Sequence, residues 1–200
     1  MKVAVDAMGA EKGVEAVIEG CLAAVAENPE IVIILVGDKG KIEDELKKRN
    51  LPPDYFSIVP TSQVVTMEDS ATVPLKEKKD STIAVGLDLV RERKAKAFVS
   101  AGNTGAIMAT SLIKLGKLKG VLRPCLAATF PTFTGKQVVL VDVGANVNCK
   151  PNHLFQFAIL GSVYAYKVLK IKNPRVGLLN IGTEENKGSN LMIETFRLLK

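Results

Sequence analysis

The 200-residue sequence contains no Trp, one His and three Cys, and its aromatic fraction is only 5%. So few aromatic side chains cannot build much of a base-stacking surface, and we expect no nucleic-acid partner despite the formal net charge of +6. The single His and the scattered carboxylates lack the spacing of a metal site, so we expect no metal. The odd and widely spaced cysteines, Cys21, Cys125 and Cys149, and a start without a secretion signal predict a reduced, cytoplasmic protein.

Long apolar runs and nucleotide-binding motifs are missing as well. The longest apolar stretch, Leu154 to Leu169, is interrupted by Gln156 and Lys167 and falls short of the roughly 18 to 20 residues of a membrane span. It predicts a core or subunit-interface helix. The sequence has no P-loop, and Asp6-Ala7-Met8-Gly9-Ala10 stands where a dinucleotide fingerprint would open the first strand–helix turn. We therefore expect neither nucleoside triphosphate chemistry nor a bound cofactor.

What is present describes a folded α/β chain. An apolar content of 47% with 24% charged residues is that of a soluble globular protein. Apolar strands alternate with helical patterns throughout, which predicts a layered, mixed and mostly parallel sheet flanked by helices. We expect residues 1–200 to form a single α/β catalytic-domain portion. The expected strands are Lys2–Asp6, Ile31–Val36, Phe56–Val59, Ala97–Ser100, Cys125–Phe130, Gln137–Val141 and Val176–Ile181.

Three further local expectations concern loops and ends. Residues 60–79 show no sustained periodicity and predict a long, mobile loop near the site. Asp80-Ser81-Thr82 predicts the cap of a helix, and the strands at 125–130 and 137–141 predict an antiparallel hairpin within the mixed sheet. The apolar stripe of the last helix reaches Lys200 without a cap, so we expect the chain to be truncated at its C-terminal end.

Three of the expected strands end in small and polar residues directly before a helix. These junctions are Ser100 to Gly105, Asp142 to Pro151 and Gly182 to Gly188. Because the carboxyl ends of parallel strands form the ligand crevice of an open sheet, we expect the three junctions to converge on one cleft.

The residues at these junctions suit anion chemistry. Gly102-Asn103-Thr104-Gly105 predicts either an anion site at a helix start or a plain tight turn, and both remain open. Lys150 and Lys187 stand at separate strand ends, which favours phosphate or carbonyl-oxygen binding over two merely solvated lysines. His153 could be a general base, but a capping or packing role is favoured. For Cys149 a plain thiol is favoured over a nucleophile.

The residues at the three junctions thus include amides and lysines but no catalytic triad. It fits a reaction whose nucleophile is already an anion and whose leaving group is already good. Inorganic phosphate attacking a thioester is such a reaction, since phosphate needs little activation and a thiol of pKa about 8.5 leaves without strong acid help. Positioning and charge neutralisation would carry the catalysis.

Five segments, in order from end to end, closely resemble one family, the phosphate acyltransferases of bacterial phospholipid synthesis. That family makes acyl phosphate from acyl-acyl carrier protein and inorganic phosphate. The segments are VAVDAMG at the start, KKDST at 78–82, SAGNTGAIMA at 100–109, DVGANVNCKPNHLFQFA at 142–158 and NPRVGLLNIGTEENKG at 173–188.

The resemblance implies a fold similar to the isocitrate and isopropylmalate dehydrogenases and to phosphotransacetylases. It also implies a homodimer, a cytoplasmic location with peripheral membrane association of the full-length form, and acyl carrier protein, phosphate and an acyl chain as partners. The catalytic residues that we predict are Lys187, Asn146 and Lys150, with Lys187 the best candidate to neutralise the reacting oxygen. The predicted phosphate- or substrate-binding residues are Ser100, Gly102, Asn103, Thr104, Gly105, Asp80, Ser81, Asn148, His153 and Gly182.

The chain departs from the family pattern at Gly9-Ala10-Glu11, where the family usually has Gly-Gly-Asp. The family chain is also about half as long again, and its later half supplies further cleft residues and the membrane-contacting helices. Two alternative functions stay open. One is a short-chain phosphotransacylase that uses coenzyme A, and the other is a binding fragment without turnover.

Overall fold

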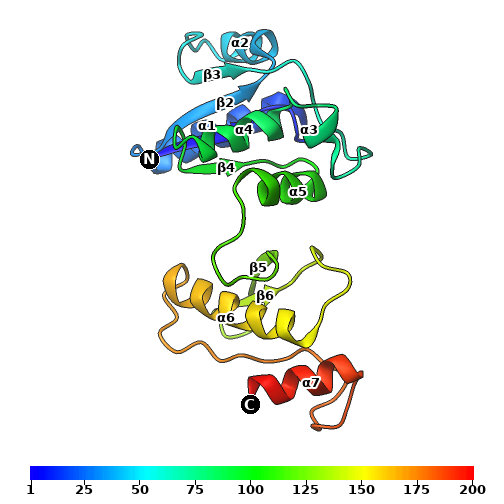
Figure 1. Ribbon diagram of the computed structural model, residues 1–200. Coiled ribbons are helices and arrows are strands. Elements are labelled where there is room, and N and C mark those ends of the chain that lie inside the picture. Colours follow the sequence, from blue (N-terminus) through cyan, green and yellow to red (C-terminus); the bar gives the residue numbers. More distant parts are fainter. The chain divides into compact units, whose positions relative to one another are not determined.

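Four parallel strands form the central sheet of the first 116 residues (Figure 1). The computed structural model describes all residues 1–200 and divides into two units, Met1–Gly116 and Lys117–Lys200. The expected single domain portion stays a prediction. The elements of unit 1 are β1 (Lys2–Asp6), α1 (Gly13–Glu27), β2 (Val32–Gly37), α2 (Lys39–Lys48), β3 (Ser57–Pro60), α3 (Val73–Lys76), α4 (Thr82–Arg91), β4 (Ala97–Val99) and α5 (Thr104–Lys114).

The sheet of unit 1 is buried on both faces, as its continuous apolar strands require. Ile33 and Leu35 of β2 pack with α1 and α2 in one apolar cluster. Their neighbours Ile34 and Val36 point to the opposite face and pack with Leu89 of α4 in a second cluster. This alternation follows from the two-residue period of a strand. It confirms the predicted α/β architecture with a parallel sheet flanked by helices.

The strand order β3-β2-β1-β4 creates a switch point beside β1. From β1 the chain adds β2 and then β3 on one side, and it returns later to add β4 on the other side. In open sheets, the crevice outside the carboxyl ends of the strands at such a point is the usual ligand site. The segments that follow β1 and β4 therefore frame the candidate site of unit 1.

The segment of residues 60–79 is irregular, as expected, apart from the one-turn helix α3. Its centre is packed rather than loose, because Val65, Val73 and Pro74 are buried. A helix of four residues leaves no periodic pattern in a sequence, which is why it was not predicted. The mobility of this loop stays a prediction.

Unit 2 contains a hairpin and two helices: β5 (Ala127–Pro131), β6 (Gln137–Val141), α6 (Pro151–Lys167) and α7 (Asn190–Leu199). The strands pair antiparallel, which confirms the predicted hairpin. The hairpin forms its own two-stranded sheet, so its expected place within a mixed sheet is wrong for this structure. Gly161 lets α6 lie close to the hairpin, because a Cβ there would stand 3.0 Å from Val141 Cγ2.

The expected strand at residues 176–181 is not formed. This segment has no regular secondary structure and pairs with no other strand. Leu179 and Ile181 are 81% and 86% exposed. The apolar run alone was not sufficient, because a strand also needs a neighbour to bond with its N–H and C=O groups. Within these 200 residues no strand takes that place.

The two units differ in their apolar packing. All three clusters of buried apolar residues lie in unit 1. In unit 2 the buried apolar residues are Phe157 and Ala165, whereas Phe133 and Val147 are nearly fully exposed. None of the helices of either unit combines the length and the apolar character needed to cross a lipid bilayer.

Candidate functional site

The start of α5 carries the residues that the sequence predicted to bind an anion in unit 1. Asn103 is its N-cap, and its side-chain Oδ1 accepts a hydrogen bond of 3.0 Å from the Ala106 amide. The amides of Thr104 and Gly105 donate to no atom of this chain, and both residues are exposed. Free N–H groups and the positive end of a helix dipole together favour an anion. The geometry thus fits the predicted anion site, with backbone groups as the donors.

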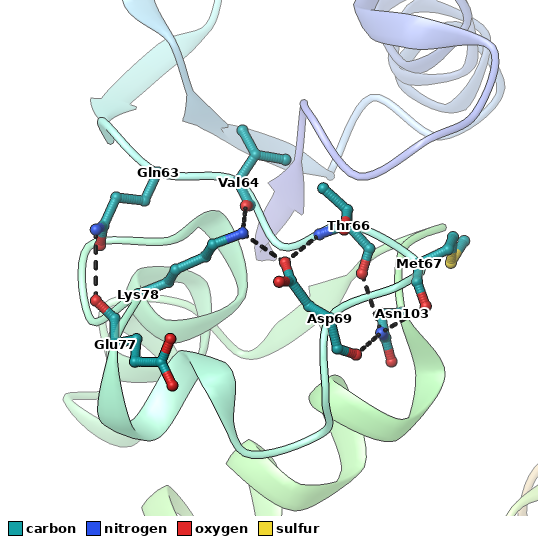
Figure 2. A network of polar contacts seen from close by, with 8 residues as sticks. All are labelled: Gln63, Val64, Thr66, Met67, Asp69, Glu77, Lys78 and Asn103. Atoms are coloured by element: carbon teal, nitrogen blue, oxygen red, sulfur yellow. Dashed lines mark hydrogen bonds and ion pairs between the residues drawn. The ribbon is translucent and has the colours of Figure 1, made fainter.

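The Asn103 side chain has a second role, because its Nδ2 faces three backbone carbonyls of the 60–79 loop (Figure 2). The distances are 3.0 Å to Thr66 O, 3.3 Å to Met67 O and 2.9 Å to Asp69 O. An amide nitrogen has only two hydrogens to donate, so these carbonyls occupy it fully. Asn103 therefore ties the loop to the helix start, and a direct contact of this side chain with a ligand stays a prediction.

An ion pair closes the same loop. Lys78 Nζ lies 2.5 Å from Asp69 Oδ2 and 2.9 Å from Val64 O, and Asp69 Oδ2 also accepts from the Thr66 amide at 2.8 Å (Figure 2). The hydrogen bond from Lys78 and that from Thr66 hold the pKa of Asp69 below its ordinary value. The Lys78 ammonium is thus engaged in bonds within the loop.

Asp80 and Ser81 are also held by internal bonds. Asp80 Oδ2 accepts from the Ser62 hydroxyl at 2.6 Å and from the Ser62 amide at 2.8 Å, which lowers the pKa of Asp80. The buried Ser81 hydroxyl accepts from the Ala84 amide at 3.4 Å and caps α4, as its sequence position predicted. Their predicted contact with substrate stays a prediction.

Ser100 and Gly102 join the α5 start to β1 through Asp6, a residue that the sequence analysis did not place in the site. The Ser100 hydroxyl donates to Asp6 Oδ2 at 2.7 Å and accepts from the Gly102 amide at 3.0 Å. Asp6 is 94 positions away in the chain. Only the parallel pairing of β1 with β4 brings the two segments together, so no local pattern could have identified the contact.

In unit 2, Asp142 organises the loop that follows β6. Its carboxylate accepts from the amides of Leu126, Ala145 and Asn146 at 2.9, 3.2 and 2.8 Å. Burial is the largest single effect and raises the pKa of Asp142. These bonds and one from the Asn146 side chain together lower it by more, so the pKa of Asp142 lies below its ordinary value. The loop is therefore folded around a carboxylate that stays charged near pH 7.

The predicted catalytic amide of Asn146 is engaged in this loop. Its Nδ2 donates to Asp142 Oδ2 and to Pro124 O, both at 2.9 Å. Both of its N–H groups are thus used within unit 2. A role as a hydrogen-bond donor to substrate would require one of these bonds to break, and the catalytic role of Asn146 stays a prediction.

His153 and Lys150 meet at the start of α6. His153 Nδ1 accepts from the Lys150 amide at 3.1 Å, and the His153 amide donates to Lys150 O at 2.9 Å. Burial, and then Arg123 and Lys150, lower the pKa of His153, so the ring is neutral at pH 7 with Nδ1 as acceptor. This geometry supports the capping role for His153. Asn148 is exposed, and its carbonyl accepts from Arg123 at 3.0 Å.

Lys150 and Lys187, the two predicted lysines, are exposed, and their ammonium groups have no partner within the chain. Neither the Lys150 nor the Lys187 ammonium makes an ion pair, and neither donates a hydrogen bond within the chain. Asn180 Nδ2 donates to Lys187 O at 2.9 Å and closes the loop that carries Lys187. A Cβ on Gly182 would lie 2.7 Å from Glu184 Oε2, the end of an exposed side chain that is able to move aside. The α5 start belongs to unit 1 and the other two junctions to unit 2, and their convergence stays a prediction.

The surroundings of the Cys149 thiol raise its pKa. Burial raises its pKa, the Asp142 carboxylate raises it further, and Arg123 offsets only part of this. The thiol faces Asn146 O at 3.8 Å. A raised pKa leaves little thiolate at neutral pH. As for metals, no group of three or more His, Cys, Asp or Glu side chains is placed to hold an ion.

Comparison with known proteins gives consistent results. The family model described as "Fatty acid synthesis protein" matches residues 1–200. The chain is 47% identical over its whole length to a phosphate acyltransferase of Alkaliphilus oremlandii and covers 59% of it. It is 50% identical to a phosphate acyltransferase of Geotalea uraniireducens, of which it covers 57%. The chain thus spans less than two thirds of the length of these relatives.

Among solved structures, a phosphotransacetylase from Staphylococcus aureus resembles the chain with a TM-score of 0.68. The match covers 98% of this chain and 62% of that protein at 18% sequence identity. A phosphotransacetylase from Streptococcus pyogenes gives a TM-score of 0.64 at 16% identity, covering 86% of this chain and 55% of the other. At such identities the likeness establishes a shared α/β fold.

Proposed function

Because this chain belongs to the fatty acid synthesis protein family, whose matched relatives are named phosphate acyltransferases, we propose that the full-length protein transfers an acyl group to inorganic phosphate. The donor that we propose is acyl-acyl carrier protein, and the product is acyl phosphate for phospholipid synthesis. The observation that carries the proposal is the α5 start, where two exposed amides without partners lie at the positive end of a helix.

The proposed chemistry needs few groups. A phosphate oxygen attacks the thioester carbonyl carbon, a C–O bond forms, the C–S bond breaks, and the leaving thiolate takes up a proton from solvent. Exposed amides such as those of Thr104 and Gly105 suit the binding of phosphate, and a free ammonium such as that of Lys187 or Lys150 suits the neutralisation of negative charge on reacting oxygens. Both lysines are free of internal ion pairs, so no existing bond has to break for this role.

Partners and location follow as further proposals. We propose a homodimer in the cytoplasm whose full-length form associates peripherally with the membrane, with acyl carrier protein and the acyl chain as binding partners. The net charge of +6 supports both an acidic carrier protein and an anionic lipid surface. The exposed apolar residues of unit 2 support an apolar partner surface.

A second candidate is a short-chain phosphotransacylase that uses coenzyme A. The structural likeness to the phosphotransacetylase of Staphylococcus aureus favours it, although that likeness concerns the fold alone. Both candidates use phosphate and a thioester, and they differ in the thiol carrier and in the acyl chain.

One assay distinguishes the two candidate functions. The full-length protein is incubated with phosphate and either a long-chain acyl-acyl carrier protein or a short-chain acyl-coenzyme A. Transfer of radiolabelled phosphate into the acyl product measures acyl phosphate directly. We expect acyl phosphate from the long-chain carrier-protein thioester. Product from the short-chain coenzyme A thioester alone would establish the second candidate, and product from neither would leave a binding role.

Replacing Cys149 by Ser is expected to leave turnover within about tenfold of the parent, less than roughly 1.4 kcal/mol of transition-state stabilisation. The raised pKa of the thiol and the ability of phosphate to attack the thioester directly are the reasons. The measurement is steady-state acyl phosphate formation, with mass spectrometry of the protein under turnover. An acyl group on Cys149, together with loss of activity in the Ser variant, would replace this mechanism with an acyl-enzyme route.

A further inference from the structure

Asp6 is a buried carboxylate at the carboxyl end of β1, the strand beside the switch point of the sheet. It is 1% exposed. Oδ1 accepts from the Met8 amide at 3.0 Å and from the Gly9 amide at 2.9 Å, and Oδ2 accepts from the Ser100 hydroxyl at 2.7 Å. A single side chain thus holds the segment after β1 and the segment after β4, the two segments that frame the candidate site.

The two segments are interlocked at a pair of glycines. A Cβ on Gly9 would lie 2.4 Å from Asp6 Oδ2 and 3.1 Å from Gly102 Cα. A Cβ on Gly102 would lie 3.4 Å from Gly9 Cα and 3.2 Å from Ser100 Oγ. A Cβ on Gly9 would not fit without a shift of its surroundings, whereas a Cβ on Gly102 would need its neighbours to move by only a few tenths of an ångström. The close contact therefore depends chiefly on Gly9. Asn103, the N-cap of α5, follows Gly102 directly.

The bonds form a continuous path from the core strand to the helix start. Asp6 accepts from the Ser100 hydroxyl, Ser100 accepts from the Gly102 amide, and the next residue begins the cap of α5. The strand β1 lies between β2 and β4 and is held on both sides by parallel pairing. The path therefore fixes a ligand-binding loop to a rigid element, which is the support that a precise anion site needs.

We infer that Asp6 is a positioning residue for phosphate, acting through Ser100 and Gly102 to fix the free Thr104 and Gly105 amides at the start of α5. The inference rests on the proposed function, because it assumes that phosphate binds there. Asp6 itself does not contact the ligand. Both of its oxygens accept hydrogen bonds within the fold, so its negative charge is balanced by donors beneath the site.

Phosphate titration of the 200-residue chain, followed through amide NMR shifts, tests the inference with four proteins. They are the unchanged chain, Ser100→Ala, Asp6→Asn, and the double variant. In the unchanged chain the Thr104 and Gly105 amides shift first. Asp6→Asn alters the bond from the Ser100 hydroxyl, and Ser100→Ala removes both bonds of the path. Each single variant is expected to weaken phosphate binding about three- to tenfold. The double variant is expected to bind no more weakly than the weaker of the two single variants, because both changes break the same path.

Two further variants separate positioning from general stability. Ser100→Thr keeps the hydroxyl and is expected to restore binding to within about twofold of the unchanged chain. Ile42→Val removes a buried methylene on the α2 side of the sheet and is expected to lower the unfolding temperature without changing the phosphate affinity. In full-length protein, Ser100→Ala is expected to raise the KM for phosphate more than it lowers kcat.

Unchanged phosphate affinity in Ser100→Ala and Asp6→Asn, with shifts still centred on Thr104 and Gly105, would overturn the inference and leave the phosphate site standing. Absence of those shifts in the unchanged chain would overturn both the site and the inference. If Asp6→Asn does not fold, Ser100→Ala and its Thr counterpart still decide the question.

Discussion

Hydrogen exchange of the 200-residue chain is expected to separate the two units by at least about a hundredfold in amide protection. Exchange protection reflects the free energy of local opening, which follows the apolar burial around each hydrogen bond. Unit 1 has three apolar clusters around a four-stranded sheet. Unit 2 has a two-stranded hairpin and few buried apolar side chains, and an isolated hairpin is only marginally stable in water.

Mass spectrometry of exchanged peptides measures this difference within one sample, so that solution conditions are identical for both units. Peptides from β1 and β2 serve as the protected reference, and peptides from β5 and β6 report on unit 2. The segment 176–181 is expected to exchange fastest of the predicted strands, since it has no strand partner. Equal protection of β1 and β6 would contradict the packing difference.

Replacing Lys187 by Ala is expected to reduce turnover of the full-length protein about ten- to a hundredfold. A lysine opposite phosphate or a developing oxyanion contributes a charge-assisted bond of roughly 1.5 to 3 kcal/mol, and each 1.4 kcal/mol is tenfold in rate. Stability is expected to stay unchanged, because the ammonium is exposed and makes no internal ion pair. Acyl phosphate formation and thermal unfolding measured on the same preparation test both statements.

Lys172→Ala is the matched control, since Lys172 is also an exposed lysine of unit 2 but lies outside the predicted site. It removes the same charge and is expected to keep full turnover. Lys187→Arg keeps the charge and is expected to recover part of the rate, because the guanidinium has a different shape and hydration. Unchanged turnover in Lys187→Ala would remove this residue from the mechanism.

Local patterns in the sequence were sufficient wherever an element depends on its own residues. The first strand, the Ser81 cap and the Pro151 start of α6 were placed correctly, because alternation, capping oxygens and a missing N–H act within a few residues. The hairpin of β5 and β6 was predicted for the same reason. For the candidate site, the sequence located the small-residue start of α5 and the exposed lysines of unit 2, and the structure leaves their ligand contacts as predictions.

Expectations from the sequence were wrong or incomplete where a structure depends on contact with a segment that is distant in the chain. Residues 176–181 have the apolar pattern of a strand, yet they form none because no strand stands beside them. The sequence did not reveal that the Asn103 amide nitrogen bonds to the carbonyls of a loop more than thirty positions earlier, and the expected ligand contact of Asn103 stays a prediction. Asp6 was overlooked because the contact that gives it importance is with Ser100, 94 positions away.

The sequence by itself determined that this protein is an α/β chain with small-residue turns at helix starts, because periodicity and turn chemistry are local properties. Only the tertiary structure decided how the side chains at those turns are used. Parallel pairing of β1 with β4 brought Asp6 under the α5 start. Folding of the 60–79 loop onto Asn103 engaged the side-chain amide of that residue, because the loop carbonyls lie within hydrogen-bond distance of it. The backbone amides of Thr104 and Gly105 stay free donors because the first N–H groups of a helix have no intrahelical partner.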